Sequence, residues 1–221
     1  MWTSFPDKIF LINLDRRTDR LATATEQLNR YNIPFERVPA IEDSNGAKGL
    51  FDTMEVIFRK SILNNWKNVL LLEDDIDIIF EGINEIMDQV VATLPSNYDI
   101  LYLGGQLCRI PETWYNKNLF PVKSFYSTHA AMYSLQGMKK FLERAPFYPV
   151  DNYICLGIQP DNNCYATYPM LISQTVTKSD IYTAEPAFDW KKYLEVKYAQ
   201  QIQRMQELNL MHPEAINYYG Q

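Results

Sequence analysis

The chain has 221 residues, of which 47% are hydrophobic and 14% aromatic, and its formal net charge is −6. This length and composition are typical of one compact globular domain and exclude a disordered chain. No apolar run approaches the roughly 18 residues that a membrane-spanning helix needs, and the start lacks a basic segment followed by an apolar one. We therefore expect a soluble, cytoplasmic protein.

The negative charge is concentrated in one segment. Between Asn68 and Cys108 there are eight acidic residues and no Lys or Arg, so the rest of the chain holds all 21 bases. Because phosphate contacts need a basic patch, this distribution disfavours a general nucleic-acid-binding surface. The three cysteines lack the paired spacing of a metal site, which indicates free thiols in a reducing compartment.

Strand and helix patterns alternate through the first half of the chain. Short, almost entirely apolar runs predict buried strands, and apolar residues at helical spacing predict helices. In chain order these are a strand at Lys8–Leu14, a helix at Thr18–Tyr31, a short strand at Phe35–Val38, a helix at Leu50–Trp66 and a strand at Val69–Leu72.

The second half is more mixed. We expect a helix over residues 83–91, strands at Ile100–Leu103, Val122–Tyr126 and Ala130–Tyr133, a helix capped by Ser134, and a polar amphipathic helix at Trp190–Leu208. The order of elements predicts an α/β fold around a mostly parallel sheet. We expect one domain over residues 1–185 and a C-terminal helical extension over 186–221, which is structural or serves association, including homo-oligomer formation.

Three polar clusters follow predicted strands. They are Asp15–Arg20, Glu73–Asp77 and the pair Gly104-Gly105. Ligands of parallel α/β sheets bind beyond the carboxyl ends of the strands. We therefore expect these clusters to meet at one site.

The acidic cluster contains four carboxylates within five residues. Such a group raises its own pKa values unless a cation neutralises it, and oxygen ligands suit Mg²⁺ or Mn²⁺. In an extended segment Glu73, Asp75 and Asp77 share one side while Asp74 faces the other. The alternative is a solvated acidic turn that caps the following helix.

The basic cluster holds Arg16, Arg17 and Arg20 at the start of a predicted helix. Because a helix N-terminus favours anions, arginines here indicate a bound dianion such as a pyrophosphate. We expect Arg17 and Arg20 to matter for this ligand more than for folding. The alternative is a set of surface salt bridges with Asp15 and Asp19.

Other motifs in the sequence are less specific. Gly104-Gly105 permits close approach of a ligand to the backbone, although a tight turn explains it equally well. His129 lies in a strand-like stretch, where a core histidine is the default interpretation. Neither a dinucleotide-binding G-x-G-x-x-G nor a phosphate-binding P-loop is present.

These pieces, in this order, resemble glycosyltransferase family 25, which includes bacterial lipooligosaccharide galactosyltransferases and collagen-modifying relatives. The resemblance covers about residues 8–180. Two places depart from the family pattern: residues 46–54 lack its Cys and His, and Ala131 stands where an aromatic is usual. The matching stretches are Ile9–Arg20, Val69–Asp75, Leu103-Gly104-Gly105, Thr128-His129-Ala130, Pro149-Val150-Asp151, Pro169 and Gln174.

The resemblance implies a GT-A-type nucleotide-sugar fold, a UDP-sugar donor (galactose or glucose) and transfer with inversion. Glu73 and Asp75 would hold Mn²⁺ or Mg²⁺, and Asp151 would be the general base, its alternative role being a helix N-cap. The acceptor would be a hydroxyl of a glycan or another molecule, with lipopolysaccharide as one example. The expected donor-binding residues are Asn13, Arg16, Arg17, Arg20, Asp74, Gly104, Gly105 and His129.

Two other functions use the same residues. A metal-dependent phosphoesterase would activate water with these carboxylates, although it usually needs a wider spread of Asp and His ligands. A non-catalytic module would bind a nucleotide sugar or a glycan without turnover.

Overall fold

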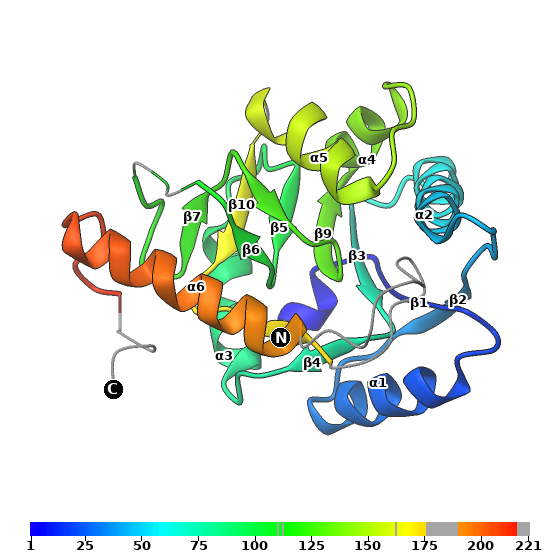
Figure 1. Ribbon diagram of the computed structural model, residues 1–221, viewed down its shortest axis with the longest axis horizontal. Helices are drawn as coiled ribbons and strands as arrows, with labels where there is room; N and C mark the ends of the chain where they lie inside the picture. The colour runs from blue at the N-terminus through cyan, green and yellow to red at the C-terminus, as the bar shows by residue number, and fades with distance from the viewer. Residues whose placement is uncertain (110, 112, 162, 176–189, 216–221) are drawn as a thin grey trace.

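The computed structural model describes residues 1–109, 111, 113–161, 163–175 and 190–215 (Figure 1). Its central sheet has seven strands in the order β2-β1-β3-β9-β5-β10-β7. The bounds in that order are Glu36–Pro39, Lys8–Asn13, Asn68–Glu73, Ala130–Ser134, Ile100–Tyr102, Cys164–Thr167 and Leu119–Pro121.

Most strands of this sheet run in one direction. β1 is parallel to both β2 and β3, and β10 is parallel to β5. β9 lies antiparallel between β3 and β5, and β7 is antiparallel to β10 at the edge. The predicted α/β class with a mostly parallel sheet is confirmed.

Helices cover both faces of the sheet. α1 (Thr18–Arg30) and α3 (Ile83–Thr93) lie on one face, and α2 (Gly46–Leu63), α4 (Leu135–Leu142) and α5 (Val150–Gly157) lie on the other. Successive side chains of a strand point to opposite faces. Leu11 of β1 accordingly joins the apolar core with Leu28 of α1, whereas its neighbour Phe10 joins the core with Phe58 of α2.

Two small two-stranded sheets were not predicted as such, although β8 lies at the end of the strand expected at Val122–Tyr126. β4 (Ile76–Ile78) pairs with β11 (Ile172–Gln174), and β6 (Gln106–Leu107) pairs with β8 (Phe125–Tyr126). Strands of two or three residues are too short to show a period of two in the sequence. The β4–β11 pair brings residues 172–174 beside the acidic segment.

Helix α2 begins earlier than the sequence predicted. Its N-cap is Asn45, whose side chain accepts a hydrogen bond from the backbone N–H of Lys48. Asn is a preferred N-cap residue because its oxygen satisfies an amide that has no partner within the helix. The extra turn extends the helix toward the carboxyl ends of β1 and β3.

The C-terminal helix α6 (Trp190–Glu207) packs against β6 and β11. Tyr198, Ile202 and Met205 are buried in the core, and the Tyr198 hydroxyl donates to the backbone oxygen of Thr167 at 2.6 Å. The predicted division at residue 185 falls within 176–189, outside the described residues, and stays a prediction.

The cysteines and the helices bear on two expectations from the sequence, free thiols and the lack of a membrane-spanning helix. Cys108 is exposed, Cys155 and Cys164 are buried, and all three are free thiols. Across the described part of the chain, no helix combines the length and apolar character that crossing a membrane requires.

Helix α4 approaches the end of the α3–β5 connection very closely at one glycine. A Cβ on Gly137 would lie 2.1 Å from the backbone oxygen of Asp99, whereas a Cβ on Gly157 of α5 would first meet a side-chain atom of Arg144 at 3.6 Å. We expect Gly137→Ala to lower the free energy of unfolding by about 1–3 kcal/mol, because backbone must move. Gly157→Ala, the matched control, should leave it unchanged or raise it by up to about 1 kcal/mol. Thermal denaturation measures both, and equal melting temperatures would contradict the expected clash.

Candidate active site

The edge at which β1 and β3 end carries a pocket of about 300 Å³. Asn13 is the last residue of β1 and Glu73 the last of β3, and both line it. The loop that follows β2 and the first turn of α2 form one wall, and residues 126–128 with 149–152 form the opposite wall. The sequence prediction of a site at the carboxyl ends of the strands therefore agrees with the position of the pocket.

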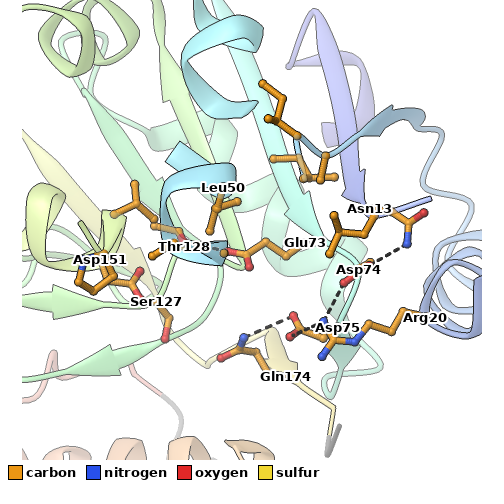
Figure 2. A pocket seen from close by; sticks show the side chains of 18 of the residues that line it. Asn13, Arg20, Leu50, Glu73, Asp74, Asp75, Ser127, Thr128, Asp151 and Gln174 are labelled. Atoms are coloured by element: carbon orange, nitrogen blue, oxygen red, sulfur yellow. Dashed lines mark hydrogen bonds and ion pairs between the residues drawn. The ribbon is translucent and has the colours of Figure 1, made fainter. Parts of the chain in front are cut away.

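Asp74 is buried at the edge of the pocket, directly after β3. Its Oδ2 accepts a hydrogen bond from Asn13 Nδ2 at 2.7 Å, and its Oδ1 accepts one from Arg20 Nη1 at 3.0 Å (Figure 2). Burial raises the pKa of Asp74, while the bonds from Asn13 and Arg20 oppose that shift. With a donor on each oxygen, Asp74 joins β1, α1 and β3 at the edge of the pocket.

Arg20 lines the pocket but is largely buried. It is 7% exposed, and its Nη1 also lies 3.4 Å from Asp75 Oδ2. It shares the buried side of α1 with Ala24 and Leu28, which follow at four-residue intervals. Because Asp74 and Asp75 depend on it for charge compensation, the structure predicts that Arg20 matters for folding as well, whereas the sequence led us to expect an effect mainly on ligand binding.

The other two arginines lie nearer the surface. Arg16 lines the pocket and its Nε donates to Glu42 at 2.8 Å. Arg17 is at the N-cap position of α1 and donates to both oxygens of Asp19, which lowers the pKa of Asp19 to about 2. Arg17 does not line the pocket, and its contact with Asp19 matches the salt-bridge alternative.

Glu73 faces the middle of the pocket. Burial raises its pKa well above the usual range, and the neighbouring carboxylates of Asp75 and Asp151 raise it further. Its Oε1 accepts a hydrogen bond from the Thr128 hydroxyl at 2.8 Å, which partly opposes the shift. Three carboxyl groups thus converge on one pocket and disfavour one another's charged forms. A bound cation would stabilise them as carboxylates.

Asp151 lies across the pocket from Asp75, in the first turn of α5 (Figure 2). Burial raises its pKa to about 6, and the Thr128 hydroxyl and Ser127 backbone oppose this shift. Among the described residues its buried Oδ1 has no hydrogen-bond partner. Pro149 is the N-cap of α5, so the N-cap alternative for Asp151 does not describe its position.

Glu73 and Asp75 are compatible with a divalent cation. Among the described residues there is no ready-made group of three or more His, Cys, Asp or Glu ligands. Mg²⁺, however, is commonly held by one or two carboxylates together with substrate phosphates and water. Two hard oxygen donors in an electronegative pocket fit that mode, and a cation would relieve the repulsion that acts on Glu73.

Comparison with known proteins agrees with this geometry. No family model matches the chain. It is 26% identical over 183 residues to a glycosyltransferase 25 family member of Aedes aegypti, and 27% identical over 192 residues to one of Anopheles gambiae. The chain is a relative of glycosyltransferase 25 family proteins. The matches cover 66% and 70% of this chain but 30% and 32% of those relatives, so the chain spans about a third of their length.

A solved structure shows the same fold. It is a glycosyltransferase involved in the glycosylation of the major capsid of PBCV-1, with a TM-score of 0.53 and 9% sequence identity. The match covers 90% of this chain and 98% of that one. The fold is thus the GT-A-like α/β fold that the resemblance to family 25 implied.

Four of the expected donor-binding residues lie outside the pocket lining. Besides Arg17, these are Gly104, Gly105 and His129. A Cβ on Gly104 would lie 1.6 Å from the backbone oxygen of Ile172. His129 is fully buried, with Nε2 3.1 Å from that same oxygen, and burial lowers its pKa to about 4. The close approach that the glycines permit is to the chain's own backbone, so a structural role accounts for all three residues.

Three residues of the pocket had no assigned role from the sequence. Gln174 Nε2 lies 3.4 Å from Asp75 Oδ1, and Ser127 and Thr128 separate Glu73 from Asp151 (Figure 2). Thr128 precedes His129 in one of the matching stretches. Because neighbours in an extended segment face opposite ways, the burial of His129 in the core places Thr128 toward the pocket.

Removing the arginine that compensates Asp74 tests its structural role. We expect Arg20→Ala to lower the free energy of unfolding by about 3–5 kcal/mol, the range for leaving a buried charge without its partner. The control is Arg59→Ala, which removes a pair with Glu55 on the exposed face of α2 and should change it by less than about 1 kcal/mol. Urea unfolding without ligand measures both. Equal destabilisation by the two variants would show that the buried pair of Arg20 with Asp74 stabilises the fold no more than an exposed ion pair does.

Proposed function

We propose that this chain is a glycosyltransferase that moves glucose or galactose from a UDP-sugar to an acceptor hydroxyl, with inversion at the anomeric carbon and with Mn²⁺ or Mg²⁺. The acceptor would be a glycan or another hydroxyl-bearing molecule. The relationship to glycosyltransferase 25 family proteins and the GT-A-like fold support this class of reaction.

The observation that carries the proposal is the division of carboxylates across one pocket. On one side Glu73 ends β3 and Asp75 follows it, and on the other side Asp151 lies in the first turn of α5. An inverting displacement needs charge stabilisation at the departing group and a base on the opposite face of the sugar. The two sides of this pocket offer both.

Asp151 is suited to the role of base. Its Oδ1 has no hydrogen-bond partner among the described residues and can accept the proton of the acceptor hydroxyl. As that proton leaves, the acceptor oxygen bonds the anomeric carbon and the bond from that carbon to the diphosphate oxygen breaks. A pKa of about 6 keeps Asp151 largely ionised at neutral pH and close to the range in which a general base works best.

The side of the pocket that carries Glu73 and Asp75 would hold the donor. Glu73 and Asp75 would bind the cation, and Lewis-acid stabilisation of the departing diphosphate is the chemistry that Mn²⁺ or Mg²⁺ supplies when bound. Arg16, at the pocket wall, would contact the phosphates. Asn13 and Asp74 would act mainly by fixing the position of Asp75 through Arg20.

Two variants separate the two walls. Asp75→Asn should abolish the Mn²⁺ dependence of UDP binding and nearly all turnover, because it removes charge from the cation site. Asp151→Asn should leave Mn²⁺-dependent UDP binding intact while turnover falls by about 10²–10⁴-fold, the usual size of a general-base contribution. Calorimetry with UDP, with and without Mn²⁺, and UDP release from UDP-glucose and UDP-galactose with an acceptor panel measure these effects.

The control variant is Asp77→Asn, in the same acidic segment but outside the pocket lining. It should bind UDP and turn over like the parent. Release of inorganic phosphate in place of UDP would indicate a phosphoesterase, and donor binding without turnover across the panel would indicate a binding module. Full activity of Asp151→Asn would show that Asp151 is not the general base.

A further inference from the structure

The two carboxylates on opposite sides of the pocket are bridged by a short turn. Ser127 and Thr128 connect β8 to β9 and lie between Glu73 and Asp151 (Figure 2). The Thr128 hydroxyl donates to Glu73 Oε1 at 2.8 Å, and Thr128 is 6% exposed. A buried hydroxyl with one proton to donate restricts the carboxylate that accepts it to one orientation.

The backbone holds Thr128 in this position by an unusual conformation. Ser127 has φ of 90°, in the left-handed region that favours glycine. Non-glycine residues persist there only where the surroundings fix them, and such positions are concentrated at functional sites.

Both ends of the turn are indeed fixed by pairing. Tyr126 pairs with Gln106 on one side, Ala130 pairs with Leu72 on the other, and the backbone N–H of Glu73 donates to the oxygen of His129 at 2.9 Å. The turn therefore cannot relax without breaking these contacts.

Asp151 lies beyond the same turn and also lines the pocket (Figure 2). The Thr128 hydroxyl has one proton and donates it to Glu73, so the contact that the structure shows fixes the Glu73 carboxylate.

We propose that Thr128, held by the left-handed Ser127, is a positioning residue that sets the orientation of the Glu73 carboxylate in the pocket. This inference rests on the proposed function for its catalytic meaning. Its geometric content is independent: without the Thr128 hydroxyl, the Glu73 carboxylate leaves its position.

Two substitutions at Thr128 separate the hydroxyl from the volume of the side chain. Thr128→Val keeps the shape and removes the hydroxyl, and Thr128→Ser keeps the hydroxyl. We expect Thr128→Val to reduce kcat for UDP release by about 10- to 100-fold, the equivalent of one hydrogen bond to a charged group, and Thr128→Ser to recover most of it. Thr167→Val, which removes a buried hydroxyl outside the pocket lining, should retain the parent kcat.

Crystal structures of the parent, Thr128→Val and Thr128→Ser decide the geometric question without any assay. We expect the Glu73 carboxylate to rotate away in Thr128→Val and to stay in place in Thr128→Ser. An unmoved Glu73 carboxylate in Thr128→Val, or a Thr128→Ser variant as impaired as Thr128→Val, would overturn the inference. A parent protein without turnover would instead count against the proposed function and leave the crystallographic comparison valid.

Discussion

The buried contact between Arg20 and Asp74 is the interaction on which the pocket depends. It connects the helix after β1 to the residue after β3, and Asn13 adds a second bond to the same carboxylate. A buried carboxylate is costly to leave without compensation, so each partner fixes the others in place. These contacts hold the carboxyl ends of two neighbouring parallel strands in register, and the functional side chains lie at those ends.

This contact also determines which carboxylates of the acidic segment are paired within the fold. Glu73, Asp74 and Asp75 are consecutive, yet Asp74 turns to Arg20 and Asn13 while Glu73 and Asp75 face the pocket (Figure 2). Arg20 compensates Asp74 at hydrogen-bond distance and reaches Asp75 at 3.4 Å. The pocket therefore retains a net negative potential from Glu73 and Asp151, which a divalent cation and its coordinated phosphates would balance.

The opposite wall comes from a distant part of the chain and from short elements. Asp151 follows Glu73 by more than seventy positions in the printed sequence, and the turn at Ser127 and Thr128 lies between them. The β6–β8 sheet precedes this turn, and the β4–β11 sheet brings Gln174 to Asp75. The proposed reaction needs a base on one wall and charge-stabilising carboxylates on the other. The fold meets this need by bringing these distant segments to one pocket.

The sequence by itself determined the α/β class, the strand-end position of the site and the acidic segment that follows β3, because apolar periodicity and local charge are properties of neighbouring residues. Asp151 was expected only through the resemblance to family 25. It could not decide which polar residues face the pocket and which stabilise the fold. His129 and Gly104 were expected to bind a ligand, yet both lie outside the pocket lining and contact another part of the chain, whereas Arg20 lines the pocket and also pairs with Asp74. Those contacts join segments that are far apart in sequence. Only the tertiary structure decides them, because burial and pairing depend on what the rest of the fold places beside each side chain.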